Sequence, residues 1–185
     1  MKRLVPLLAA LAFALPAAAR EWNVDMTRST LGFTATYQGE AFDGRFERFG
    51  AKIAYDPADL AHAKFDVSVD LASADTQNAE RDQMLPGADF FDVAKFPRAR
   101  FVSTGFRRAA DGTVLADGIL TLRGVSRPLT LTVKFTPAAA GAALDVGASL
   151  RRLDFGVGGG DWADTSVIAN AVTVKAHLAL TPAGG

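Results

Sequence analysis

The residues in this sequence that could carry out chemistry are few and lie far apart. His62 follows a turn that begins at Pro57, and His177 lies on the polar phase of the last predicted strand. No His-x-x-x-His or His-Glu pair accompanies either of them. Zinc sites need several such ligands at short spacing. We therefore expect two solvated histidines and no metal site.

Three aspartates, Asp154, Asp161 and Asp164, flank the glycine-rich segment Gly156–Gly160. A calcium loop needs oxygen ligands at alternate positions and a terminal glutamate, and this spacing does not match. The glycines also lack the Gly-Lys-Ser/Thr ending of a phosphate-binding loop. We expect a solvated, mobile loop at one end of the fold.

The sequence also lacks the residues that nucleophilic catalysis needs. No Gly-x-Ser-x-Gly motif is present, and no serine lies in a sequence typical of a triad. The sequence contains no cysteine, which excludes thiolate chemistry, cysteine-ligated zinc and iron–sulfur clusters. No catalytic constellation emerges, so the sequence predicts a protein that is not an enzyme and has no catalytic cofactor.

One charged pair, Arg81 and Asp82, lies in a segment unlike the rest of the chain. Ala79–Leu85 has the composition of a short helix, with Asn78 as its N-cap and Pro86-Gly87 as its end. No base or metal-ligand set accompanies the pair. We expect a helical connection near residues 78–86 that Arg81 and Asp82 anchor by ion pairs or capping.

Almost all other periodicity in the chain has a period of two, which is typical of half-buried antiparallel strands. Turn signals separate these runs: Asp111-Gly112 indicates a hairpin, and Gly124 with Pro128 indicates another short connection. Many short strands at even spacing predict an all-β fold, a single antiparallel barrel of about eight strands. The clearest runs are residues 31–37, 63–71, 129–136, 144–151 and 172–180.

The first 19 residues have the pattern of a cleavable signal peptide. A basic start is followed by an apolar run too short to span a bilayer, and Ala17–Ala19 offers a small-residue cleavage site. We expect residues 1–19 to be removed and residues 20–185 to form one domain in the periplasm. The chain has 20 basic and 20 acidic residues and no basic run, which disfavours nucleic acid as a partner.

Several motifs, in order along the whole mature chain, resemble the YceI-like family. They are WNVD at 22–25 with Ser29 and Phe33, GRF at 44–46 with Phe49, RDQML at 81–85, DFF at 89–91, FP at 96–97 with Phe101, DGILTLRGVSRP at 117–128, RLDFGV at 152–157 and the closing strand at 172–180. Many members read Arg-Asp-x-His-Leu where this chain has Met84. An apolar, adaptable side chain thus replaces a histidine.

The resemblance implies a lipocalin-like β-barrel in the periplasm with a long apolar tunnel. It also implies binding of a long-chain isoprenoid lipid, a polyisoprenoid or an isoprenoid quinone. Some members occur with membrane proteins of the cytochrome b561 type, which suggests such a partner here. The sequence leaves open whether the protein is a monomer or a homodimer.

Our leading hypothesis is a periplasmic carrier or store for such a lipid, held among inward-facing residues. Inward positions that mix phenylalanine with alanine leave gaps for an apolar ligand. The alternative is an accessory module for a membrane b-type cytochrome that acts through its loop at 156–165, with Trp162 exposed. The residues expected to line the lumen are Phe33, Phe65, Val67, Val69, Phe90, Phe91, Phe101, Leu120, Leu131, Val133 and Val174.

Phe90 and Phe91 lie where the chain returns to the barrel. Neighbouring residues of an extended chain point to opposite faces. We therefore expect one of these rings to face the lipid and the other to pack outward under the helix.

Overall fold

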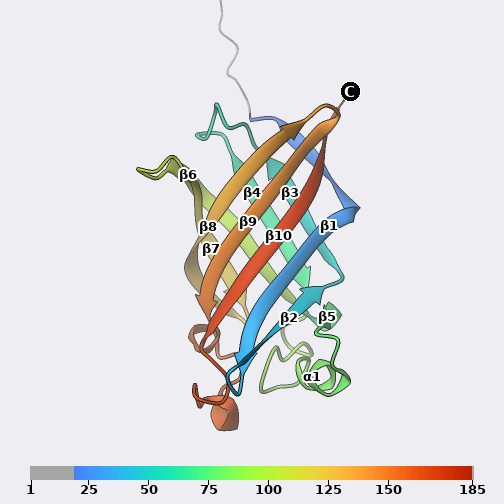
Figure 1. Cartoon of the computed structure of the whole chain (residues 1–185), viewed down its shortest axis with the longest axis vertical. Helices are drawn as coiled ribbons and strands as arrows, with labels where there is room; N and C mark the ends of the chain where they lie inside the picture. Colours follow the sequence, from blue (N-terminus) through green and yellow to red (C-terminus); the bar gives the residue numbers. More distant parts are fainter. Residues whose placement is uncertain (1–18, 185) are drawn as a thin grey trace, which may run out of the picture.

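The computed structural model describes residues 19–184, so the predicted signal peptide, apart from Ala19, lies outside the described residues. Ten antiparallel strands form one sheet that closes on itself where β10 pairs with β1 (Figure 1). The strands are β1 (Glu21–Tyr37), β2 (Glu40–Phe46), β3 (Phe49–Ala54), β4 (Lys64–Asp70), β5 (Ala74–Asp75), β6 (Arg98–Arg108), β7 (Val114–Leu122), β8 (Val125–Ala138), β9 (Gly141–Arg151) and β10 (Ala171–Pro182).

The sheet is a closed barrel of eight strands, as predicted. Strands β2 and β3 both pair antiparallel with β1, β2 along its second half and β3 at its start. They are therefore two halves of one barrel strand, interrupted at Glu47 and Arg48. Strand β5 is a two-residue edge that pairs only with β2 in this part of the structure.

One end of the barrel, the upper end in Figure 1, is filled by aromatic side chains. The Trp22 indole donates a hydrogen bond to the Tyr55 carbonyl at 2.8 Å, which joins β1 to the end of β3. Phe65 and Phe106 meet edge to face with ring centroids 4.8 Å apart, and Tyr55 packs on Phe135 at 5.3 Å. Aromatic contacts of this kind add to the free energy gained by burial and close this end.

At the opposite end the hydrogen-bonding pattern of the wall changes. Strand β2 pairs with β5 instead of with β4, so residues 71–97 cover this side as an excursion. The excursion contains the 3-10 helix η1 (Leu71–Ser73) and the helix α1 (Ala79–Met84). The Asn78 side chain caps α1 by accepting a hydrogen bond from the Arg81 backbone N–H, which confirms the predicted helix and its cap.

Hydrogen bonds anchor α1, and Thr76 is their centre. The Asp82 carboxylate accepts from both the backbone N–H and the hydroxyl of Thr76, at 2.8 and 2.7 Å. The Arg81 guanidinium donates to the hydroxyl and the carbonyl of the same residue. Both side chains thus tie α1 to the segment before it. They do so through Thr76, and neither the ion pair nor the capping bond expected of Arg81 and Asp82 occurs among residues 19–184.

The strands run further than the turn signals predicted. Asp111-Gly112 does form the β6–β7 hairpin, and Gly124 forms the next turn with a φ of 73°. Pro128, however, lies inside β8 opposite Ile119, and β8 continues to Ala138. Sheet pairing therefore overrides the local signal. No helix among residues 19–184 is long and apolar enough to cross a membrane.

The Thr76 anchor can be tested by replacing Asp82. Asp82→Ala leaves the N–H and hydroxyl of Thr76, a residue 4% exposed, without their acceptor. We expect the free energy of unfolding to fall by about 1–3 kcal/mol in denaturant titrations. Asp82→Asn keeps an acceptor oxygen at this position and is the matched control; an equal loss in both variants would contradict this account.

Candidate functional site

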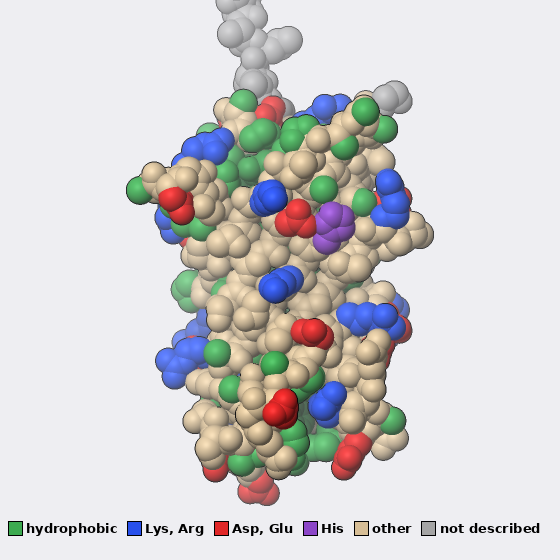
Figure 2. All heavy atoms as spheres, viewed as in Figure 1, with side chains coloured by type: hydrophobic (Ala, Val, Ile, Leu, Met, Phe, Trp, Pro, Cys, Tyr) green, Lys and Arg blue, Asp and Glu red, His purple; other side chains and the backbone are tan. Residues whose placement is uncertain are grey.

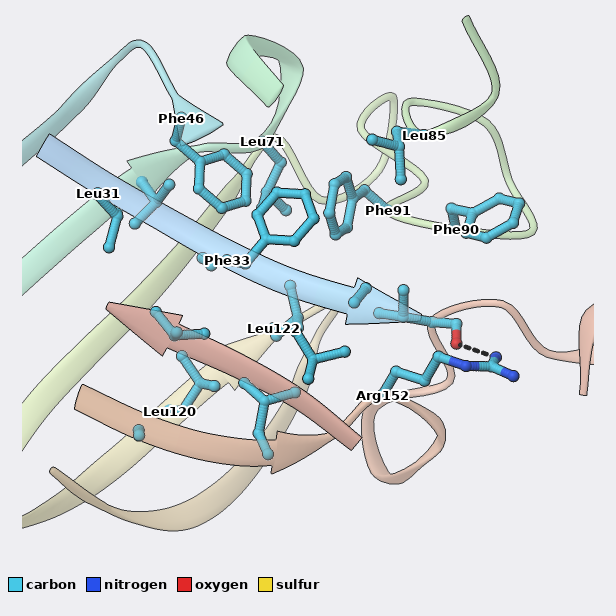
Figure 3. Close-up of a pocket in the computed structure, with 18 of the residues that line it drawn as sticks. Leu31, Phe33, Phe46, Leu71, Leu85, Phe90, Phe91, Leu120, Leu122 and Arg152 are labelled. Atoms are coloured by element: carbon cyan, nitrogen blue, oxygen red, sulfur yellow. Dashed lines mark hydrogen bonds between the residues drawn. The ribbon is translucent and has the colours of Figure 1, made fainter. Parts of the chain in front are cut away.

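The barrel encloses an apolar cavity of about 420 Å³ between its aromatic end and the residues 71–97 (Figure 3). Cavities of this size and lining are typical of small-molecule sites. All the strands except β5 contribute residues to its lining. The wall residues include Leu31, Phe33, Ala35, Val67, Val69, Phe101, Leu120, Leu122, Leu131, Val146, Ala148, Leu150, Val174 and Ala176.

Nine of the eleven residues predicted to face the lumen border this cavity. The two exceptions are Phe65 and Val133, which are buried in the aromatic core at the closed end. Both face inward as predicted, but they lie at a different height in the barrel. Alternation in a strand predicts the face of a side chain and carries no information on its depth. The nine are Phe33, Val67, Val69, Phe90, Phe91, Phe101, Leu120, Leu131 and Val174.

The prediction that only one of Phe90 and Phe91 borders the cavity is wrong. Both lie in turns, where the Phe90 N–H donates to the Gly87 carbonyl and the Phe91 N–H to the Leu85 carbonyl. Both residues border the cavity, although their rings point apart in Figure 3, Phe91 toward Phe33 and Phe46 and Phe90 away from them. The extended geometry on which the prediction depended does not apply here.

The two rings have different neighbours. Phe91 is buried and packs on Phe46 with ring centroids 6.1 Å apart. Phe90 packs on Trp162 at 5.7 Å. Trp162 was predicted to be exposed; it is half-buried and borders the cavity. Its ring therefore belongs to the site rather than to a free outer surface.

Two aromatic rings that border the cavity pack directly over glycines of the neighbouring strand. A Cβ atom at Gly44 would lie 2.3 Å from the Phe33 ring, and one at Gly118 would lie 2.4 Å from the Phe101 ring. Each ring therefore occupies space that a larger residue on the neighbouring strand would fill. Both rings border the cavity without closing it.

Arg152 was not predicted as a site residue, although it organises this end of the barrel. It begins the 3-10 helix η2 (Arg152–Phe155), is 4% exposed and borders the cavity. Its guanidinium donates to five backbone carbonyls, one of them drawn in Figure 3. The acceptors are Val157, Gly158, Trp162, Ile168 and Ala169.

These bonds hold the backbone of the loop after β9, which is only partly the solvated loop expected from its glycines: Gly160, Asp161 and residues 163–166 are exposed. Phe155 and Val157 are buried within it. Desolvation lowers the pKa of Arg152 from its ordinary value, yet an arginine stays charged in proteins. The sequence offers one weak signal of this arrangement, an arginine directly before a glycine-rich segment whose backbone carbonyls need donors.

The same loop is joined to the residues after α1. The Gly158 N–H donates to the Asp89 carbonyl at 2.7 Å, and the Arg123 guanidinium bonds the carbonyls of both Gly156 and Ala88. With the Phe90–Trp162 contact, these bonds close one side of the barrel end. Besides Arg152, the charged and amide side chains that border the cavity at this end are those of α1 and its N-cap.

These polar side chains come from Asn78, Glu80 and Arg81. The Arg81 guanidinium lies 4.1 Å above the centroid of the Phe42 ring, across the gap between α1 and β2. Met84 also borders the cavity, so this position contributes an apolar side chain to the wall. We call this polar edge, residues 78–81 with Phe42, the mouth.

Both histidines lie outside the cavity. His62 pairs with Asp59 and His177 with Asp145, each at an exposed position. Among residues 19–184 no group of three or more metal-binding side chains comes together. The outer face in Figure 2 shows charged side chains scattered singly over the strands rather than gathered in one patch.

A closed antiparallel barrel around an apolar cavity defines the lipocalin-like class of β-barrels. Within that class the chain belongs to the YceI-like family, since the model of the YceI-like domain matches residues 22–180.

Relatives and solved structures agree with this assignment. The chain is 35% identical to a UPF0312 protein of Vibrio vulnificus over 133 residues, 71% of this chain and 70% of that protein. The crystal structure of Burkholderia cenocepacia BcnA superposes with a TM-score of 0.81 at 30% identity, covering 85% of this chain and 99% of that one. A polyisoprenoid-binding domain from Saccharophagus degradans shares the fold, with a TM-score of 0.67 at 18% identity over 90% and 100% of the two chains.

The division between closed end and cavity predicts the effect of replacing Phe65. This side chain is 1% exposed and packs on Tyr55 and Phe106. Phe65→Ala should lower the free energy of unfolding by about 3–5 kcal/mol, measured by denaturant titration. Retention of whatever apolar molecule the cavity holds should not change in the folded variant; loss of retention with unchanged stability would place Phe65 in the site.

The Arg152 network predicts a second stability effect. Arg152→Met removes the donors of five carbonyls at once, and we expect a loss of about 3 kcal/mol or more. Hydrogen exchange should locate that loss in residues 153–170. Arg152→Lys keeps the charge with fewer donors and should be intermediate; unchanged exchange rates in the loop would show that the network does not order it.

Proposed function

We propose that this protein binds a long isoprenoid lipid, either a polyisoprenoid or an isoprenoid quinone, in the barrel cavity and carries or stores it. The observation that supports this most is the cavity itself, whose lining is mostly apolar and carries Asn78, Glu80 and Arg81 at the mouth. The shared fold of the polyisoprenoid-binding domain from Saccharophagus degradans adds support.

The energetics of such a ligand suit the site. Burial of apolar carbon contributes about 0.8 kcal/mol per CH₂ group, so a few isoprene units supply enough free energy for stable binding. Apolar walls of suitable shape are then sufficient to bind the tail, and no catalytic group is needed there. A head group would remain at the mouth, where Asn78, Glu80 and Arg81 offer polar contacts.

The proposed location follows from the sequence. With residues 1–19 as a cleaved leader, the mature chain would work in the periplasm, an aqueous compartment that free isoprenoids cross poorly. A quinone ligand would link the protein to a membrane partner of the cytochrome b561 type. In that role the barrel would shield the lipid from water between two membranes or two proteins.

Lipid binding can be tested with a pair of variants in β9. Ala148 borders the cavity, whereas Ser149 points to the exposed outer face. Ala148→Phe should fill the lumen and abolish lipid retention, and Ser149→Phe should leave it intact. Native mass spectrometry of protein purified from its host, with analysis of an organic extract, measures both.

The wild-type protein should carry excess mass that matches an isoprenoid lipid in the extract. A bare mature mass under gentle conditions, with no lipid extracted, would contradict the proposal. So would retention by Ala148→Phe equal to that of Ser149→Phe.

A further inference from the structure

Three arginines border the cavity, and their hydrogen-bonding states differ. Arg152 donates to five carbonyls. Arg100 forms a bidentate ion pair with Asp66, in which its Nε and Nη2 lie 2.8 and 2.6 Å from the two carboxylate oxygens. Among residues 19–184, Arg81 makes only two side-chain hydrogen bonds, both to Thr76 and both long, at 3.2 and 3.4 Å. Arg81 therefore stands apart from the other two.

The donors of Arg81 can be counted. A guanidinium has five N–H donors, and two are used here, so three remain available within the part of the chain that the structure describes. No carboxylate of that part forms an ion pair with it, although Glu80 and Asp82 are its chain neighbours; Asp82 bonds Thr76 instead. The guanidinium thus keeps a charge and a donor edge for another group.

The orientation of Arg81 is fixed while its donors are free. The Phe42 ring supports one face of the guanidinium at 4.1 Å, and Thr76 holds its Nε edge. A planar donor group held in this way loses little conformational freedom when an oxyanion binds. Its position at the mouth places it where the head group of a lipid in the cavity would lie.

We propose that Arg81 binds an anionic phosphate head group, so that the preferred ligand is a prenyl phosphate rather than a neutral isoprenoid. This inference rests on the proposed function, because the tail must occupy the cavity. Arginine recognises phosphate oxygens through paired, charge-assisted hydrogen bonds, whereas an alcohol offers a single neutral oxygen. Glu80 borders the same mouth and opposes an anion, so its removal should strengthen the preference.

The test compares farnesyl phosphate with farnesol, which share a tail and differ in the head. Trp162 borders the cavity, so titrations followed by tryptophan fluorescence report binding. In a low-salt buffer, Arg81→Met should weaken farnesyl phosphate binding by about tenfold or more and change farnesol binding by less than about twofold. Glu80→Gln should tighten the binding of farnesyl phosphate alone, and Arg81→Lys should restore part of the loss.

Arg151 provides the matched control. It is exposed at the same end of the barrel and does not border the cavity, so Arg151→Met should leave both affinities unchanged. Thermal unfolding checks that each variant is folded. An Arg81→Met variant that loses both ligands equally, or neither, would overturn the head-group assignment.

Two other results separate this inference from the proposed function. Wild-type protein that binds neither farnesyl phosphate nor farnesol, nor retains lipid from its host, would overturn the proposed function itself. Inorganic phosphate is the third ligand of the series. If it binds as tightly as farnesyl phosphate, the site is one for free phosphate and the lipid assignment is wrong.

Discussion

The size of an eight-stranded barrel is the constraint on which the rest of this structure depends. Such a barrel is just wide enough either to be filled by its own side chains or to hold one ligand. This chain does both at different heights. Aromatic rings around Tyr55 and Phe65 fill one end, and the other end keeps a cavity of about 420 Å³ because Phe33 and Phe101 lie against Gly44 and Gly118.

A barrel that is open at one end needs a cover whose backbone polar groups are satisfied. The chain contains no cysteine, so no disulfide can hold such a cover. Arg152 holds the cover together on one side, because it donates hydrogen bonds to five carbonyls of a single loop. Thr76 holds it on the other side through hydrogen bonds to Arg81 and Asp82 of α1. Hydrogen bonds from two buried polar residues thus replace covalent links.

The sequence predicted those features that depend on local pattern. Alternation predicted the barrel and the inward faces, and the Asn78 cap predicted α1, because both arise from contacts close along the chain. Depth within the barrel depends on pairing between distant strands, so Phe65 and Val133 were misplaced. Turn geometry after α1, rather than strand alternation, brought both Phe90 and Phe91 to the border of the cavity, and bonds from Arg152 hold the backbone of a loop whose glycines indicated only a solvated segment.

The same division shapes how this barrel can select a ligand. The walls are mostly apolar, and the two arginines on them, Arg100 and Arg152, are engaged by other groups of the protein, so the walls distinguish one isoprenoid tail from another mainly by length and shape. Polar discrimination must then come from the mouth, where α1 contributes Glu80 and Arg81 and its N-cap contributes Asn78. Met84, beside them, is apolar and offers a head group no hydrogen bond of ordinary strength. Recognition of the head group in this chain therefore falls to the edge of α1 that faces Phe42, and Arg81 is the residue on that edge whose donors are not already used.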